Sequence, residues 1–169
     1  DLKGGMNVIL EVSVPDVVKA LADHKTDETF VNAVANASKQ AASSNSDFIT
    51  LFIKEYKNQK PDGTLAELFA TQQLKDKVNT KSTDAEVEAV LRAEVDAAID
   101  NSFNVLRTRI DRFGVAQPNI QELEGSMGRI MIELPGVKEP ERVRKLLQGS
   151  ANLEFWETYT SAEIAPFLA

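Results

Sequence analysis

The chain has 169 residues, with 26 acidic against 19 basic side chains and a formal net charge of −7 at pH 7. An acidic surface repels phosphate backbones and anionic lipid, so nucleic acid is not an expected partner. The absence of cysteine excludes disulfides, thiolate metal ligands and a cysteine nucleophile, and there is only one histidine. This composition does not favour a transition-metal site or a histidine-based catalytic site, and we assign no catalytic, cofactor-binding or metal-binding residue.

The chain opens with "DLKGGMNVILEVSV", in which every second residue from Met6 to Val14 is apolar. This period of two predicts a strand with one face on a core, closed by Pro15. The strand begins only five residues after Asp1, the first residue of the sequence. The final "SAEIAPFLA" has the capping pattern of a helix start. We expect both ends to be cut from a longer protein.

Residues 15–82 are predicted to form a helical insertion, because their apolar residues recur at spacings of one, three and four. Ser46 is the expected N-cap of the third helix, and the polar residues 75–83 are expected to be loop. The predicted helices lie around Val17–Ala22, Phe30–Ala37, Phe48–Tyr56 and Leu65–Phe69.

An aromatic stripe within this insertion consists of Phe48, Phe52 and Tyr56, at helical spacing. Such a stripe is typical of a core helix, and in other proteins it lines a groove for an apolar peptide. The three residues are therefore the candidates for contact with a polypeptide.

A long helix is predicted to follow the insertion. Thr83 and Glu86 have the spacing of a capping box, and the apolar face that starts after them continues to Gly114, where the helix should end. Glu88 and Arg92, four residues apart, can form an ion pair on its surface.

Three arginines, Arg107, Arg109 and Arg112, crowd the end of this helix. Cations there complement the partial negative charge of a helix C-terminus, so we interpret them as structural. The acidic residues between 84 and 100 are interrupted by Arg92 and indicate a solvated face rather than a metal site.

The stretch "VAQPNIQELEGSMGRIMIELPG" predicts two strands of a hairpin joined across Gly125 to Gly128. Pro140 then opens a short helix that Gly149 ends, and "ANLEFWETY" is the last predicted strand.

The predicted order is strand, long helix, strand, strand, helix, strand, which is the split β-α-β arrangement of an α+β, ferredoxin-like fold with a helical insertion after the first strand. The ferredoxin-like base is expected at residues 1–14 and 83–160, the insertion at 15–82, and the truncated start of a following segment at 161–169. This fold hosts many unrelated functions, so it assigns none by itself.

The stretch "VLRTRIDRFGVAQPNIQELEGSMGRIMIELPGV" resembles the SecD and SecDF family of bacterial protein-export membrane proteins. Members carry "R-x-R-[ID]-x-x-G-V-x-x-P-x-I-Q" and then "R-I-x-[VI]-E-L-P-G-V", and "DLKGG" and "GSANLEF" match two further motifs in the right order. The matched positions are interpreted as structural: Asp1, Leu2, Gly4, Gly5, Arg109, Gly114, Val115, Pro118, Leu134, Pro135, Gly136, Leu153 and Phe155.

The resemblance implies the N-terminal part of the first large periplasmic domain, on the outer face of the cytoplasmic membrane. Such a domain engages unfolded preprotein leaving the Sec channel and helps export driven by the proton-motive force, together with a SecF-type partner. Asp1–Gly5 would follow a membrane helix that anchors the protein. The residues tied to proton passage belong to membrane helices, so we expect no enzymatic activity here. Residues 15–82 are longer than the family's usual connection.

Two other functions fit the predicted fold. A stand-alone ferredoxin-like regulatory or ligand-binding module would contain a small-molecule pocket. An acyl-phosphate hydrolase would need an anion-binding loop after the first strand, whereas "DLKGG" precedes it. For preprotein capture, an open sheet edge and an apolar groove are both suitable surfaces.

Overall fold

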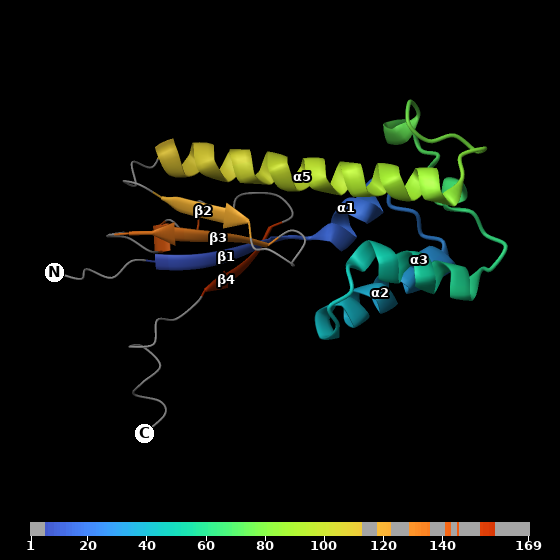
Figure 1. Ribbon diagram of the computed structural model, residues 1–169, viewed down its shortest axis with the longest axis horizontal. Coiled ribbons are helices and arrows are strands. Elements are labelled where there is room, and N and C mark those ends of the chain that lie inside the picture. Colours follow the sequence, from blue (N-terminus) through green and yellow to red (C-terminus); the bar gives the residue numbers. More distant parts are fainter. Residues whose placement is uncertain are drawn as a thin grey trace, which may run out of the picture. The chain divides into compact units, whose positions relative to one another are not determined.

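The computed structural model describes residues 6–112, 118–122, 129–135, 141–142, 145 and 153–157 (Figure 1). The chain divides into a helical unit, Val14–Ala98, and a sheet unit made of Asp1–Ser13 and Ile99–Ala169. The boundary falls within helix α5 (Asp84–Arg112), which therefore contributes residues to both units. The helical unit includes the insertion expected at 15–82 and extends beyond it along α5.

The sheet unit contains an antiparallel sheet whose described strands are ordered β2-β3-β1-β4. Strand β1 (Met6–Val12) lies between β3 (Arg129–Leu134) and β4 (Leu153–Glu157), and β2 (Asn119–Glu122) pairs with β3. The predicted strands and the antiparallel pairing of the hairpin are confirmed, except that the first strand ends at Val12 and not at Val14, because Val14 and Pro15 already belong to the first helix. The hairpin turn at 123–128 lies outside the described residues.

One face of this sheet packs against the last turns of α5. Alternate residues of β1 and β3 point to this face, and Leu106 and Ile110, four residues apart on the helix, meet them there. The resulting core consists of Val8, Leu10, Leu106, Ile110, Ile130, Ile132 and Leu134, with Phe103 and Ile120 packed against it.

The architecture is mixed α and β, as predicted, with a long helix between the first and second strands. The predicted end of this helix at Gly114 lies outside the described residues, and α5 reaches at least Arg112. The second helix of the expected order, after Pro140, also lies largely outside them.

The helical unit contains all four helices predicted for residues 15–82. The first begins at Val14, so Pro15 lies in its first turn, where the missing N–H of proline costs no hydrogen bond. The elements are α1 (Val14–Leu21), α2 (Glu28–Ser43), α3 (Phe48–Gln59), α4 (Leu65–Phe69) and the 3-10 turn η1 (Gln72–Leu74).

The N-cap of α3 is Asp47, so the prediction of Ser46 is wrong by one residue. The Asp47 carboxylate accepts a hydrogen bond from the Thr50 backbone N–H at 3.1 Å and another from the Thr50 hydroxyl at 2.7 Å. A carboxylate at this position also gains from the positive end of the helix dipole, which a serine hydroxyl does not.

The start of α5 has the predicted capping box. The Thr83 backbone N–H donates to Glu86 Oε2 at 2.8 Å, and the Glu86 N–H donates to Thr83 Oγ1 at 3.2 Å. These reciprocal bonds satisfy two donors that a helix start leaves without intrahelical partners.

Five aromatic rings form the centre of the helical unit, and Phe52 contacts the other four. Its ring centroid lies 5.8 Å from Phe30 and 6.1 Å from Phe69 in edge-to-face geometry, and 6.0 Å from Phe48 and 6.4 Å from Tyr56 in stacked geometry. Such pairs add to the stabilisation that comes from burying the rings.

Arg92 of α5 joins α5 to the start of α3 within this unit. Its guanidinium donates to Asp47 at 3.1 Å, to the Thr50 hydroxyl at 3.0 Å and to Glu88 at 2.9 Å. The predicted pair of Glu88 and Arg92 is therefore confirmed, and Asp47 serves both as helix cap and as ion-pair partner.

Three described carboxylates of the helical unit, Asp47, Glu67 and Asp84, have a pKa below the ordinary value, and the hydrogen bond and charge of Lys60 lower that of Glu67. Burial favours the neutral form of Asp47, but the Thr50 hydrogen bonds and the Arg92 charge outweigh burial and lower the pKa below its ordinary value of 3.8. For Asp84 burial acts in the same way, and the pKa is lowered by Lys57, 2.5 Å away, and by the Leu65 N–H at 2.9 Å.

No helix in the described part of the chain combines the length and the apolar character that crossing a membrane requires.

We predict that Phe52→Ala lowers the free energy of unfolding by about 3–5 kcal/mol, because it opens a cavity where four rings meet. Urea unfolding measures this. Val31→Ala on α2 is the control, because that side chain is 49% exposed, and it should change stability by about 0.5 kcal/mol or less. Equal losses in both variants would contradict the buried aromatic centre.

The lowered pKa of Asp47 predicts a loss of stability in acid. A carboxylate with a folded pKa below its unfolded value stabilises fully above the unfolded value, and this stabilisation is lost as the pH falls through the folded value. Between about pH 5 and pH 3 the native protein should lose more stability than Asp47→Asn, which keeps a capping oxygen without the charge.

The expected difference is about 1 kcal/mol or less, because both side chains of the Asp47–Arg92 pair are 34% exposed. Urea unfolding at a series of pH values measures it. Asp84 is present in both proteins, so the comparison isolates Asp47, and parallel stability curves would disprove the coupling.

Candidate functional site

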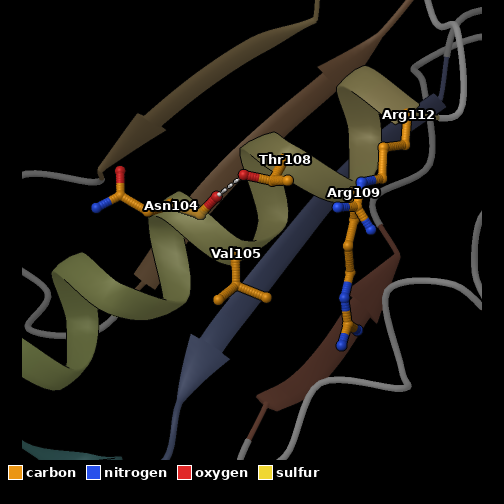
Figure 2. A pocket seen from close by; sticks show the side chains of 5 residues that line it. All are labelled: Asn104, Val105, Thr108, Arg109 and Arg112. Atoms are coloured by element: carbon orange, nitrogen blue, oxygen red, sulfur yellow. Dashed lines mark hydrogen bonds between the residues drawn. The ribbon is translucent and has the colours of Figure 1, made fainter.

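A shallow hollow of about 290 Å³ lies along one flank of α5 in the sheet unit. Its lining residues recur at steps of one, three and four, which places them on the same side of a helix. Figure 2 shows all five side chains leaving this one helix. We call this surface the arginine flank, and it comprises Asn104, Val105, Thr108, Arg109 and Arg112.

The arginine flank lies beside the buried face of α5. Leu106 and Ile110 turn into the sheet core, and this fixes the rotation of the helix about its axis. Val105 and Arg109 are consequently half-buried, whereas the remaining three flank side chains are exposed. The core therefore determines which side chains are presented at the surface.

Hydrogen-bonding groups line the arginine flank. The Thr108 hydroxyl donates to the Asn104 backbone carbonyl at 2.9 Å, one turn earlier, and Figure 2 marks this bond. Arg109 stretches away from the helix in the same view. With two guanidinium groups, an amide and one apolar side chain, the flank is suited to a ligand that carries negative charge.

Arg107 lies on a different side of the same helix. Its guanidinium carbon is 5.3 Å from the centre of the Phe103 ring, a cation–π arrangement within one turn. The three arginines at the end of α5 therefore divide between two surfaces, although the sequence places them together.

The outer strands of the described sheet provide a second surface. Strand β2 pairs with β3 alone in the described sheet, and its residues Asn119 and Gln121 are exposed. The Asn119 amide donates to Glu133 of β3 at 3.2 Å. An outer strand offers backbone N–H and C=O groups to which an extended peptide can pair.

Groups suited to acid–base or metal chemistry are sparse in the described residues. None of their buried side chains is charged, and no three His, Cys, Asp or Glu side chains among them are grouped to hold a metal ion.

The three aromatic candidates for polypeptide contact lie in the interior of the helical unit. Phe48, Phe52 and Tyr56 are 6%, 0% and 1% exposed, so the core interpretation of the stripe agrees with the structure and the groove interpretation does not. Phe30 and Phe69 complete the cluster, because α2 and α4 cover this face of α3. Buried rings offer no surface to a polypeptide.

The family-motif residues are spread over the sheet unit. Arg109 is on the arginine flank, Leu134 is buried at the end of β3 and is followed by the exposed Pro135, and Pro118 precedes β2. Leu153 and Phe155 of β4 are in register with Val12 and Leu10 of β1. The remaining positions lie outside the described residues: Asp1, Leu2, Gly4, Gly5, Gly114, Val115 and Gly136.

The interpretation from the sequence missed Asn104, Val105 and Thr108 as neighbours of the arginines. The signal was present, because residues 104, 105, 108, 109 and 112 follow the helical repeat. It carried little weight, because polar residues on one side of a helix ordinarily face solvent without any specific role.

Comparisons with known proteins agree on one family. Residues 99–160 match the family described as "Protein translocase subunit SecDF, P1 domain, N-terminal". The protein translocase subunit SecD of Rhodothermus marinus is 40% identical over 155 residues, which cover 92% of this chain and 24% of that protein. SecD of Calditerrivibrio nitroreducens is 28% identical over 190 residues, covering 98% of this chain and 34% of that protein.

These matches bear on the helical insertion. Because the Rhodothermus alignment covers 92% of the chain, it includes most of residues 15–82, so the insertion is shared with at least that SecD. The chain spans about a quarter to a third of the length of these two relatives. No solved structure matches it.

We predict that Arg112→Gln changes the free energy of unfolding by about 0.5 kcal/mol or less, because the side chain is exposed. Leu106→Ala, one turn away on the buried face, should cost about 2–5 kcal/mol. Urea unfolding of both variants measures the contrast. A large loss for Arg112→Gln would mean that Arg112 is structural.

Proposed function

Since this chain belongs to the SecD family of protein translocase subunits, we propose that it forms a periplasmic part of a membrane-anchored accessory subunit of the Sec translocase. There it engages unfolded preprotein leaving the Sec channel and helps export driven by the proton-motive force, together with a SecF-type partner. The observation that carries this proposal is the 40% identity to a SecD over 92% of the chain.

The proposal gives this part of the protein a binding role without a catalytic one. Export requires binding to polypeptides of many different sequences. Hydrogen bonds to the peptide backbone and apolar contacts both tolerate such differences in sequence. The exposed outer edge of β2 is a surface of this kind in the sheet unit. We therefore place preprotein contact on the sheet edge rather than on the buried aromatic cluster.

We also propose that the sheet unit is a ferredoxin-like base. The strand order β2-β3-β1-β4 with antiparallel pairing supports this, as does the position of α5 between β1 and β2. The residues between β3 and β4 are sufficient in number for the second helix of that fold. A stand-alone regulatory module on the same fold is not favoured by any specific observation on the described residues.

We predict that photo-crosslinking in the full-length membrane protein captures a stalled export substrate from the β2 edge. The photoreactive residue replaces Gln121, and the matched probe replaces Val31 on α2, since both positions are exposed. Crosslinks from Gln121 should require both translocation and the proton-motive force, and they should exceed those from Val31.

Crosslinks that persist without translocation would contradict a role in export. Substrate captured from Val31 alone would move the contact to the helical unit. If neither probe is crosslinked while the channel itself still is, the preprotein-binding role of this part is wrong.

A further inference from the structure

The link between α2 and α3 is short, polar and exposed. It consists of Ser44, Asn45 and Ser46, which lie between the end of α2 and the N-cap Asp47 of α3. The Ser46 backbone N–H donates to Ser44 Oγ at 3.3 Å, a long hydrogen bond that water can replace. The backbone that follows Asn45 is therefore exposed to water and belongs to neither helix.

An asparagine that precedes a small residue can lose ammonia without an enzyme. The backbone nitrogen of the next residue loses its proton to hydroxide and forms a bond to the asparagine Cγ. The bond from Cγ to Nδ2 breaks, and ammonia leaves with a proton taken from water, which regenerates hydroxide. Water then opens the cyclic imide at either carbonyl and gives aspartate or isoaspartate. The reaction requires a weakly bonded N–H and backbone dihedral angles that let the nitrogen approach Cγ.

We propose that Asn45 is a site of spontaneous deamidation in the folded protein. Ser46 has a small side chain, an exposed position and an N–H whose hydrogen bond is easily replaced, so its nitrogen can reach Asn45 Cγ. Water and hydroxide are sufficient for the reaction. The site is therefore independent of the proposed function and of any partner of the chain.

The same dipeptide occurs again in α5, where the fold blocks the reaction. Asn101 is exposed, as Asn45 is, and Ser102 follows it, but both residues lie inside the helix. In the interior of an α-helix each N–H is bonded to the carbonyl four residues earlier, and the dihedral angles are fixed. The Ser102 nitrogen must leave the helix before it can attack, so Asn101 reacts only through local opening.

Asp62 and Gly63 form a third site, at which the fold protects a more reactive sequence. Aspartate followed by glycine forms the same imide with loss of water, and glycine hinders the attack least. The Gly63 N–H, however, donates to the Lys60 carbonyl at 3.0 Å, and the Gly63 carbonyl accepts from Lys57 Nζ at 2.5 Å. Gly63 is also buried, and a Cβ there would lie 2.7 Å from the Tyr56 hydroxyl. We therefore expect Asp62 to be stable in the folded protein.

The fold tolerates the product of deamidation at position 45. The new carboxylate lies two residues before the N-cap Asp47, near the positive end of the α3 dipole. Arg92 binds Asp47 at 3.1 Å and adds a positive charge to the same region. The modified protein should therefore stay folded while its net charge becomes more negative.

The test follows the full-length protein during incubation at mildly alkaline pH. Peptide mapping by mass spectrometry measures the fraction converted at Asn45 and Asn101, and separate elution identifies isoaspartate at Asp62. In the folded protein Asn45 should react at least about tenfold faster than Asn101, because a helix interior reacts only after local opening. In urea the two asparagines should react at similar rates, and isoaspartate should form faster at Asp62 than in the folded protein.

Substitution of Ser46 gives a matched pair of variants. Ser46→Gly should raise the rate at Asn45 several-fold, and Ser46→Val should lower it several-fold, because a branched side chain hinders the attack. The rate at Asn101 should stay unchanged in both, and it also reports folding, since unfolding would raise it. Equal rates at Asn45 and Asn101 in the folded protein, or a rate at Asn45 that ignores both substitutions, would overturn the proposal.

Discussion

Helix α5 has to bury apolar residues in two different cores, and much of the structure depends on this constraint. In the helical unit, Val87, Leu91 and Val95 are buried at steps of four, and in the sheet unit Leu106 and Ile110 do the same. A step of four keeps each group on one side of the helix. No glycine or proline occurs between Asp84 and Arg112, so nothing in the backbone interrupts the hydrogen bonds that join the two parts of the helix.

Within the helical unit, an apolar interior and a polar surface contact determine different things. Burial of Phe52 among four other rings stabilises the unit, but apolar contacts do not depend on the direction of approach. Arg92, in contrast, makes directional hydrogen bonds to the N-cap Asp47, the Thr50 hydroxyl and the Glu88 carboxylate. The planar guanidinium has five donors in a fixed geometry, which a lysine ammonium does not offer. The hydrogen bonds of Arg92 therefore position the start of α3 against α5, and burial of the aromatic rings stabilises this packing.

The arginine flank illustrates how a fold separates charges that the sequence groups together. Arg107 and Arg109 differ by two residues, but the rotation of the helix sends them to different surfaces, one over Phe103 and the other into the hollow. The net charge of −7 describes the whole chain and says little about such a local surface. A ligand meets such a local surface and not the average charge of the chain.

The sequence by itself determined where the described strands lie, the four helices between residues 15 and 82, the capping box of Thr83 and Glu86 that starts α5, and the family, because each depends on local spacing or on a contiguous motif. Only the tertiary structure decided that the stripe of Phe48, Phe52 and Tyr56 is a core: helical spacing shows that residues share a face, and the elements packed against that face decide whether it is covered. The tertiary structure likewise shows that Asp47 is the N-cap of α3, where the guanidinium of Arg92, 45 residues later in the chain, binds its carboxylate. The arginine flank needed the sheet as well, since burial of Leu106 and Ile110 sets the rotation that brings Arg109 and Arg112 to one surface.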